Sequence, residues 1–270
     1  MRFLTSITKL DHHYWIIIGV ISSIFLISAN MAWLNPNPDY VIKTNQSVPI
    51  LWQFNGDATV EFLSAAYFPK YFRVDKTRIN RPSYPLAAKI LGEAYGLLAL
   101  PIHPLNPLEK GLLGYMTLKL IVYLSAAITL YHLVRRWLPK AVALLSVPLV
   151  FFHPFAVVYS GTFHTSELQF ITPIFLIALW LNLVDHYSHR KNILFSILVG
   201  ILMLAKQNYA VYLAILLFSF FISKKYKETV LSFVAHLGPL IIWLVVLKLL
   251  GIPYYNHEAA SNGDGLWIFT

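Results

Sequence analysis

The apolar run YWIIIGVISSIFLISANMAWL occupies residues 14–34 and decides the fold class. A helix needs about 20 apolar residues to cross the hydrocarbon core of a bilayer, and this run meets that length. Arg2 and Lys9 precede it. A secretory signal peptide has a shorter apolar region and a small-residue cleavage site, so the run is predicted to be a retained first membrane span.

The composition of the whole chain agrees with a lipid environment. Hydrophobic residues make up 57% of the 270 residues and charged residues 12%, whereas soluble domains carry about 25% charged residues. The formal charge of +9 is explained by Lys and Arg beside membrane spans, which argues against a nucleic-acid partner. Cysteine is absent, which excludes disulfides and thiolate metal sites.

Further apolar segments follow the first, and together they predict an all-α polytopic membrane protein with about seven transmembrane helices. A single membrane domain over residues 1–250 is predicted to precede an outer-side tail, residues 251–270. The short segments at 193–205 and 209–222 are predicted to form a hairpin with KQN at its tip. The predicted spans are 14–34, 112–134, 141–159, 168–184, 193–205, 209–222 and 229–250.

Lys and Arg recur in every second loop of this arrangement, in RRWLPK, DHYSHRK and SKKYKE. Short basic loops face the cytoplasm in membrane proteins. The N-terminus is therefore predicted to be cytoplasmic, and the loop 35–111, the segment SGTFHTSE and the KQN tip to lie on the other side. We expect an integral protein of the plasma or inner membrane with its active site on the non-cytoplasmic face.

The long outer loop is predicted to carry two amphipathic interfacial helices. One covers Val60–Phe72 and is interrupted by Pro69, and the other covers Tyr84–His103. They flank the charged stretch RVDKTRINRP. The first helix carries four aromatic side chains, Phe62, Tyr67, Tyr71 and Phe72.

Acidic residues occur in both of the first two loops that are predicted to lie outside the cytoplasm. Asp57 lies in FNGD and, taken alone, is best explained as a helix N-cap. Glu61 follows one turn later, either as a solvated partner or as a positioning group. Glu167 opens the segment 168–184, where it either caps a helix or serves a functional cavity. His164 either assists Glu167 or is a structural histidine.

Lys206 in the KQN tip either belongs to a simple turn or reaches an anionic group. Arg73, Lys76, Arg78 and Arg81 form a cationic cluster in the outer loop. Its members either contact anionic lipid headgroups or bind a phosphate, a task that suits the planar donor fork of Arg. Gln207 and Asn208 give the tip further polar groups. The cations considered for phosphate binding are Arg73, Arg78, Arg81 and Lys206.

The order of these features resembles the GT-C superfamily of integral membrane glycosyltransferases, which includes the protein O-mannosyltransferases and the aminoarabinose transferases. Its members share a cytoplasmic N-terminus, a long first outer loop with two membrane-parallel helices, and a functional Asp after the first span. The chain shows this order as Trp15–Leu34, FNGD with Asp57, the helical segments and RINRPSYPL. Glu167 matches a second acidic position. The chain departs from the pattern where Ala58 follows a single Asp.

The resemblance implies an enzyme that takes a sugar from a polyprenyl-phosphate donor within membrane lipid. It also implies that the aromatic side chains of the first outer-loop helix lie at the level of the lipid headgroups. Asp57 would deprotonate or orient the acceptor, and Glu167 would position the acceptor or help to hold a metal. The implied cofactor is a divalent metal, Mg²⁺ or Mn²⁺, which some members use. The implied donor-phosphate ligands are Arg73, Arg78, Arg81 and Lys206, and the implied positioning residues are Glu61, His164, Gln207 and Asn208.

Two other hypotheses fit the sequence. A transporter or flippase of lipid-linked sugars would use the same cations for a passing phosphate, and a non-catalytic fragment of a larger glycosyltransferase would explain the short chain. Transporters commonly show internal repeats and broken helices at mid-membrane. Here the polar residues gather toward the outer face, so an enzyme is the favoured prediction.

Overall fold

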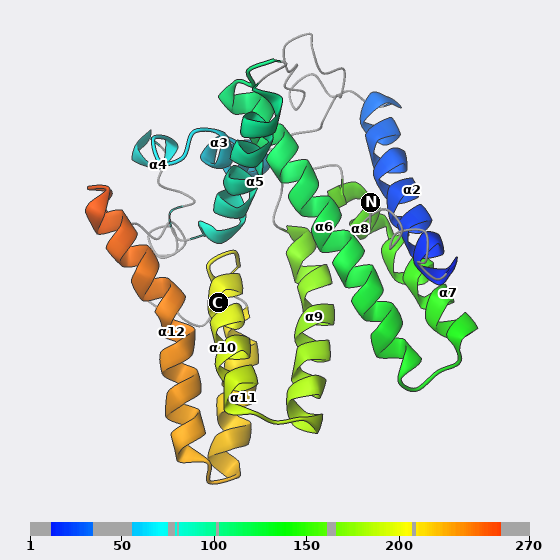
Figure 1. Ribbon diagram of the computed structural model, residues 1–270, viewed down its shortest axis with the longest axis vertical. Coiled ribbons are helices and arrows are strands. Elements are labelled where there is room, and N and C mark those ends of the chain that lie inside the picture. The colour runs from blue at the N-terminus through cyan, green and yellow to red at the C-terminus, as the bar shows by residue number, and fades with distance from the viewer. Residues whose placement is uncertain are drawn as a thin grey trace. The chain divides into compact units, whose positions relative to one another are not determined.

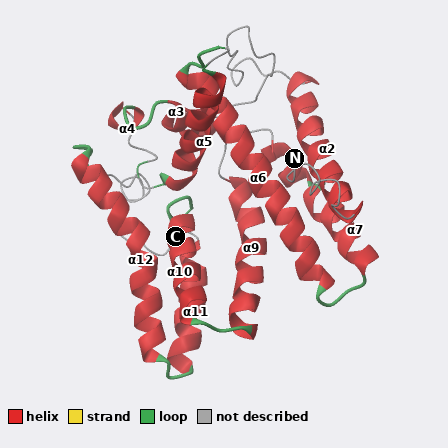
Figure 2. Cartoon of the chain, viewed as in Figure 1, coloured by secondary structure: helices red, strands yellow, loops and turns green. Residues whose placement is uncertain are grey.

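The computed structural model describes residues 12–34, 56–74, 79, 81–100, 103–160, 166–206 and 209–254. The regular secondary structure of these residues is entirely helical, as Figure 1 and Figure 2 show. The prediction of an all-α protein is therefore confirmed for the described part of the chain.

The helices follow one another with short connections. Their bounds are α2 (His12–Leu34), α3 (Gly56–Ala66), α4 (Tyr71–Val74), α5 (Ser83–Ala99), α6 (Pro107–Arg135), α7 (Lys140–Phe151), α8 (Pro154–Ser160), α9 (Ser166–Asp185), α10 (His189–Met203), α11 (Ala210–Ile222) and α12 (Tyr226–Leu249).

Each predicted span coincides with helical structure, but the predicted range 141–159 contains two helices. Helix α7 ends at Phe151 and α8 begins at Pro154. Pro154 has no N–H group to donate, and it disfavours helical backbone at the residue before it, His153. The local sequence therefore explains the break.

Two helices among the described residues, α6 and α12, are long and apolar enough to cross a membrane. Shorter apolar stretches lie at His12–Ile27, Lys140–Phe151, Phe170–Asp185 and Ala210–Ile222. Helix α11 has 13 residues. At 1.5 Å per residue it is about 20 Å long, less than the hydrocarbon thickness of about 30 Å. An integral membrane protein is supported, and the number of crossings stays a prediction.

The chain forms two compact units, residues 1–58 with 116–178 and residues 59–115 with 179–270. In the first unit, α2 packs against α7 and α8. The core includes the buried side chains of Ile21, Tyr123 and Phe151. The Tyr123 hydroxyl donates a hydrogen bond of 3.0 Å to the Ala156 carbonyl oxygen, so this buried polar group is satisfied.

In the second unit, α10 and α12 lie side by side, and α11 packs on α12 (Figure 1). Helices α10 and α12 run in the same direction, because Asn192 bonds to Ser232 near their starts and Leu204 packs with Trp243 near their ends. A Cβ atom at Gly200 would overlap the carbonyl oxygen of the opposite helix. A small residue here therefore permits the close backbone approach that membrane helices use.

The described part of the outer loop contains helices in both predicted places. Helix α3 ends before the turn that contains Pro69, α4 follows that turn, and α5 covers most of the predicted second helix. Phe62 and Phe72, expected at the headgroup level, are both 0% exposed. Phe62 lies against Gly111, and Phe72 lies in an apolar cluster with Trp243. Both side chains therefore pack against other residues of the protein.

Candidate functional site

The two acidic residues assigned to catalysis occupy the first turns of helices. Asp57 is the second residue of α3, and Glu167 is the second residue of α9. A negative charge is favourable at a helix N-terminus, because it faces the positive end of the helix dipole. Both side chains lie outside the described residues, so the catalytic assignment stays a prediction.

Glu61 lies one turn after Asp57 on α3 and is almost completely buried. Its exposed fraction is 1%, so the interpretation of Glu61 as a solvated partner is wrong. Phe62 and Ser64 on the same helix are also buried. Burial of a carboxylate is costly unless it is hydrogen-bonded or paired, and Glu61 does interact with other groups in the structure. A built environment of this kind is compatible with a positioning role.

Arg73 contacts the C-terminal end of α12. Its Nη2 group donates a hydrogen bond of 2.9 Å to the carbonyl oxygen of Leu250, the C-cap residue of that helix. The last carbonyl groups of a helix have no partner within the helix, and a cation is favourable beside them. A guanidinium group has five N–H donors, so one such bond does not exhaust it.

The two ends of the segment around Arg81 are fixed to the C-terminal ends of α10 and α12. The indole Nε1 of Trp243 donates a buried hydrogen bond of 2.7 Å to the Ile79 carbonyl oxygen. The Ser83 N–H group donates one of 3.3 Å to the Leu204 carbonyl oxygen. Arg81 lies between these bonds, and Lys206 follows Leu204 by two residues. The structure therefore brings the segments of two predicted phosphate ligands together.

Trp243 itself was not among the sequence candidates. It is 4% exposed, and its ring lies 5.9 Å from that of Phe72 at an interplanar angle of 80°. A tryptophan within an apolar helix gives no sign of which distant carbonyl group it will bond. The remaining predicted site residues, Arg78, His164, Gln207 and Asn208, lie outside the described residues.

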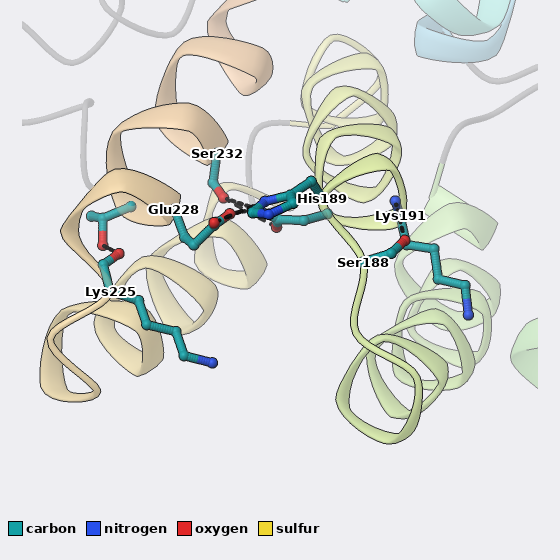
Figure 3. Close-up of polar contacts among 8 residues, drawn as sticks. Ser188, His189, Lys191, Lys225, Glu228 and Ser232 are labelled. Carbon is teal, nitrogen blue, oxygen red and sulfur yellow. Dashed lines mark hydrogen bonds and ion pairs between the residues drawn. The ribbon is translucent and has the colours of Figure 1, made fainter.

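A second polar cluster lies at the opposite ends of α10 and α12, where these helices begin. The carboxylate of Glu228 accepts from His189 Nδ1 at 2.9 Å and from Asn192 Nδ2 at 3.4 Å. Asn192 and Ser232 also bond to each other, at 2.9 and 3.1 Å. Figure 3 shows His189 directed from α10 toward Glu228 on α12. We call these four residues the Glu228 cluster.

The loop before α10 adds Tyr187 to the Glu228 cluster. Burial, followed by a hydrogen bond to the Glu228 carboxylate, raises the pKa of Tyr187. The Lys225 ammonium group lies 5.2 Å from the centre of the Tyr187 ring, a cation–π contact. Side chains of the protein satisfy the Glu228 carboxylate, so the cluster is best explained as a structural contact between helices.

The described residues contain no group of three or more His, Cys, Asp or Glu side chains that could hold a metal ion. Mg²⁺ and Mn²⁺ prefer oxygen ligands, and Mg²⁺ is usually held by only one or two carboxylates together with substrate phosphates. The side chains of Asp57 and Glu167 lie outside the described residues, so the divalent metal implied by the resemblance stays a prediction.

Comparison with known proteins gives one family. The model of the dolichyl-phosphate-mannose-protein mannosyltransferase family matches residues 109–250, just over half of the chain. The matched range contains Glu167, Lys206 and Trp243, whereas Asp57 and Arg81 precede it. No curated protein and no solved structure matches the chain significantly.

Proposed function

Because the chain belongs to the dolichyl-phosphate-mannose-protein mannosyltransferase family, we propose that it transfers a sugar from a polyprenyl-phosphate-linked donor to an acceptor on the non-cytoplasmic face of its membrane. Family membership identifies a membrane glycosyltransferase of the GT-C type, and this is the observation that carries the proposal. The name of the family contains a lipid-linked mannose donor, dolichyl-phosphate-mannose. We take from it the class of donor and leave the acceptor open.

In the proposed reaction, an acceptor oxygen attacks the anomeric carbon of the donor sugar. The bond between that carbon and the phosphate oxygen breaks, and its electron pair leaves with the polyprenyl phosphate. Asp57 takes the acceptor proton as general base. Glu167 orients the acceptor, together with Glu61, His164, Gln207 and Asn208.

The leaving phosphate gains negative charge as the glycosidic bond breaks, and fixed cations lower the energy of that step. We assign this task to the cations at the C-terminal ends of α10 and α12. The hydrogen bonds from Trp243 to Ile79 and from Ser83 to Leu204 support the assignment of Arg81 and Lys206. Arg73 beside Leu250 and Arg78 complete the proposed set.

The proposal is tested by sugar transfer from labelled polyprenyl-phosphate sugars in lipid, with the wild type beside Asp57→Asn. Loss of a general base is expected to lower the transfer rate by about 100-fold or more, with binding of polyprenyl phosphate retained. Asp185→Asn is the matched control, because Asp185 is an exposed residue at the end of α9.

Two results would contradict the proposal in different ways. Full activity of Asp57→Asn would reduce Asp57 to a residue that stabilises the start of α3. No transfer by the wild type from any lipid-linked sugar would favour a fragment or a transporter. Movement of the labelled donor across a liposome membrane would then separate these two.

A further inference from the structure

The hydrogen bond between Trp243 and Ile79 joins residues 164 positions apart in the sequence. Its donor is the indole N–H group of α12, and its acceptor is a main-chain carbonyl group of the charged outer-loop stretch. Trp243 is 4% exposed and Ile79 is 0% exposed. The bond is therefore shielded from water, where a lost partner is costly.

Apolar side chains surround both partners of this bond. The rings of Phe68 and Phe72 lie 6.4 and 5.9 Å from the Trp243 ring. Leu204 and Leu247 belong to the same buried cluster as Ile79. The ring of Trp243 thus packs against apolar side chains, and its N–H group donates a hydrogen bond to the Ile79 carbonyl oxygen of the outer loop.

Arg81 follows Ile79 by two residues and precedes Ser83, the second fixed point, by two. With both ends of so short a segment bonded to α10 and α12, the backbone of Arg81 has little freedom to move. A cationic side chain that is already held in place does not have to move when negative charge develops on the ligand, so it stabilises that charge more effectively.

We propose that Trp243 is a positioning residue, which acts through the Ile79 carbonyl group to hold Arg81 beside Lys206 for the phosphate of the lipid-linked donor. The inference rests on the proposed function, because it takes Arg81 and Lys206 as phosphate ligands. It adds a residue of α12 that touches neither donor nor acceptor. A purely structural Trp243 would affect stability without a specific effect on phosphate binding.

The test uses the full chain in lipid nanodiscs and measures binding of fluorescent polyprenyl phosphate and the thermal midpoint, Tm. Trp243→Phe removes the N–H donor and keeps an aromatic ring. Leu247→Ala is the control, because it weakens the same apolar cluster without removing the hydrogen bond. We expect Arg81→Gln to weaken binding about tenfold and Trp243→Phe about fivefold. Leu247→Ala is expected to lower Tm more than Trp243→Phe and to leave binding unchanged.

The double variant Trp243→Phe with Arg81→Gln distinguishes a positioning role of Trp243 from a purely structural role. If Trp243 acts through Arg81, the double variant binds polyprenyl phosphate as Arg81→Gln does, because coupled residues are not additive. Additive losses, or a loss in Leu247→Ala that follows its Tm, would overturn the positioning role. Normal binding by Arg81→Gln would overturn the phosphate assignment itself. Sugar transfer, measured in parallel, reports independently on the proposed enzyme activity.

Discussion

Helices α10 and α12 use polar groups in opposite ways at their two ends. Where the helices begin, the Glu228 cluster places a carboxylate inside the contact and surrounds it with donors from the protein. Where they end, the buried contact consists of apolar and aromatic side chains with one indole hydrogen bond. There the cationic side chains of Arg81 and Lys206 are only partly buried.

Glu228 carries a charge that stabilises the fold, whereas Arg81 and Lys206 carry charges that can bind a ligand. Asn192 is 0% exposed and Glu228 is 8% exposed, so these groups meet other protein groups rather than solvent. A buried polar network stabilises a helix pair only when its members are satisfied. Partly exposed cations beside the apolar cluster that contains Ile79, Leu204 and Trp243 can instead meet an anion from solvent or from the membrane surface.

The largest effect on folding is expected from Glu228→Ala. The substitution leaves the buried Asn192 side chain and the Tyr187 hydroxyl group without a carboxylate acceptor. We expect a loss of about 2–3 kcal/mol in the free energy of unfolding, the range for hydrogen bonds to a charged group. Unfolding in mixed micelles that contain a denaturing detergent measures this loss.

The matched control for that experiment is His189→Ala. The His189 side chain is 65% exposed, so we expect its removal to cost less than about 1 kcal/mol. Binding of polyprenyl phosphate should be unchanged in both variants. Weaker binding in Glu228→Ala at temperatures where it is folded would show that the two ends of the helix pair are coupled, and the contrast between them would fail.

A smaller effect is expected in the middle of the same helix pair, from Gly200→Ala. A Cβ atom at Gly200 would overlap the His236 carbonyl oxygen, whereas one at Gly238 on α12 would meet nothing within 4 Å. We expect Gly200→Ala to cost about 1–3 kcal/mol, typical of overpacking. Gly238→Ala is expected to be neutral or to stabilise by up to about 1 kcal/mol, since Ala favours helix more than Gly does.

Both glycine variants are measured by the same detergent unfolding. Equal effects of the two substitutions would indicate that helix propensity, rather than close contact between α10 and α12, decides the outcome. A cost at Gly200 alone would show that the close contact between α10 and α12 at this position decides the outcome.

The helices and their order could be predicted from the sequence, because long apolar blocks and basic loops carry local information. The break between α7 and α8 also has a local cause, since Pro154 is visible in the sequence. The contacts between distant helices could not be predicted. Nothing local in α12 indicates that Trp243 bonds to a carbonyl group 164 residues away.

The charges show the same limit most clearly. In the sequence, Glu228 belongs to SKKYKE, which reads as a basic loop, but the structure buries its carboxylate in the first turn of α12. Glu61 was predicted to be either a solvated partner or a positioning group, and it is buried even more completely than Glu228. Arg73 was expected to meet phosphate, and it contacts a helix C-terminus. Burial and partners of a charge depend on tertiary packing, which periodicity does not encode.

The smallest expected effect concerns a charge that is both paired and open to solvent. Glu93 on α5 bonds to Lys110 on α6 at 2.8 Å and to Lys89 on its own helix, and its side chain is 44% exposed. Hydrogen bonds from Lys110 and then Lys89 lower the pKa of Glu93. We expect Glu93→Gln to cost about 0.5 kcal/mol at neutral pH, as for exposed ion pairs.

The contribution of Glu93 to the free energy of unfolding is expected to depend on pH. Because the folded-state pKa of Glu93 is lowered from 4.5, its contribution is present above that pH and is lost as the pH falls through the lowered value. The unfolding free energies of the wild type and Glu93→Gln should therefore converge in acid, where Lys89 and Lys110 face a neutral side chain in both. A difference that persists in acid would mean that Glu93 acts through packing. It would then resemble the buried Glu228 more than an exposed pair.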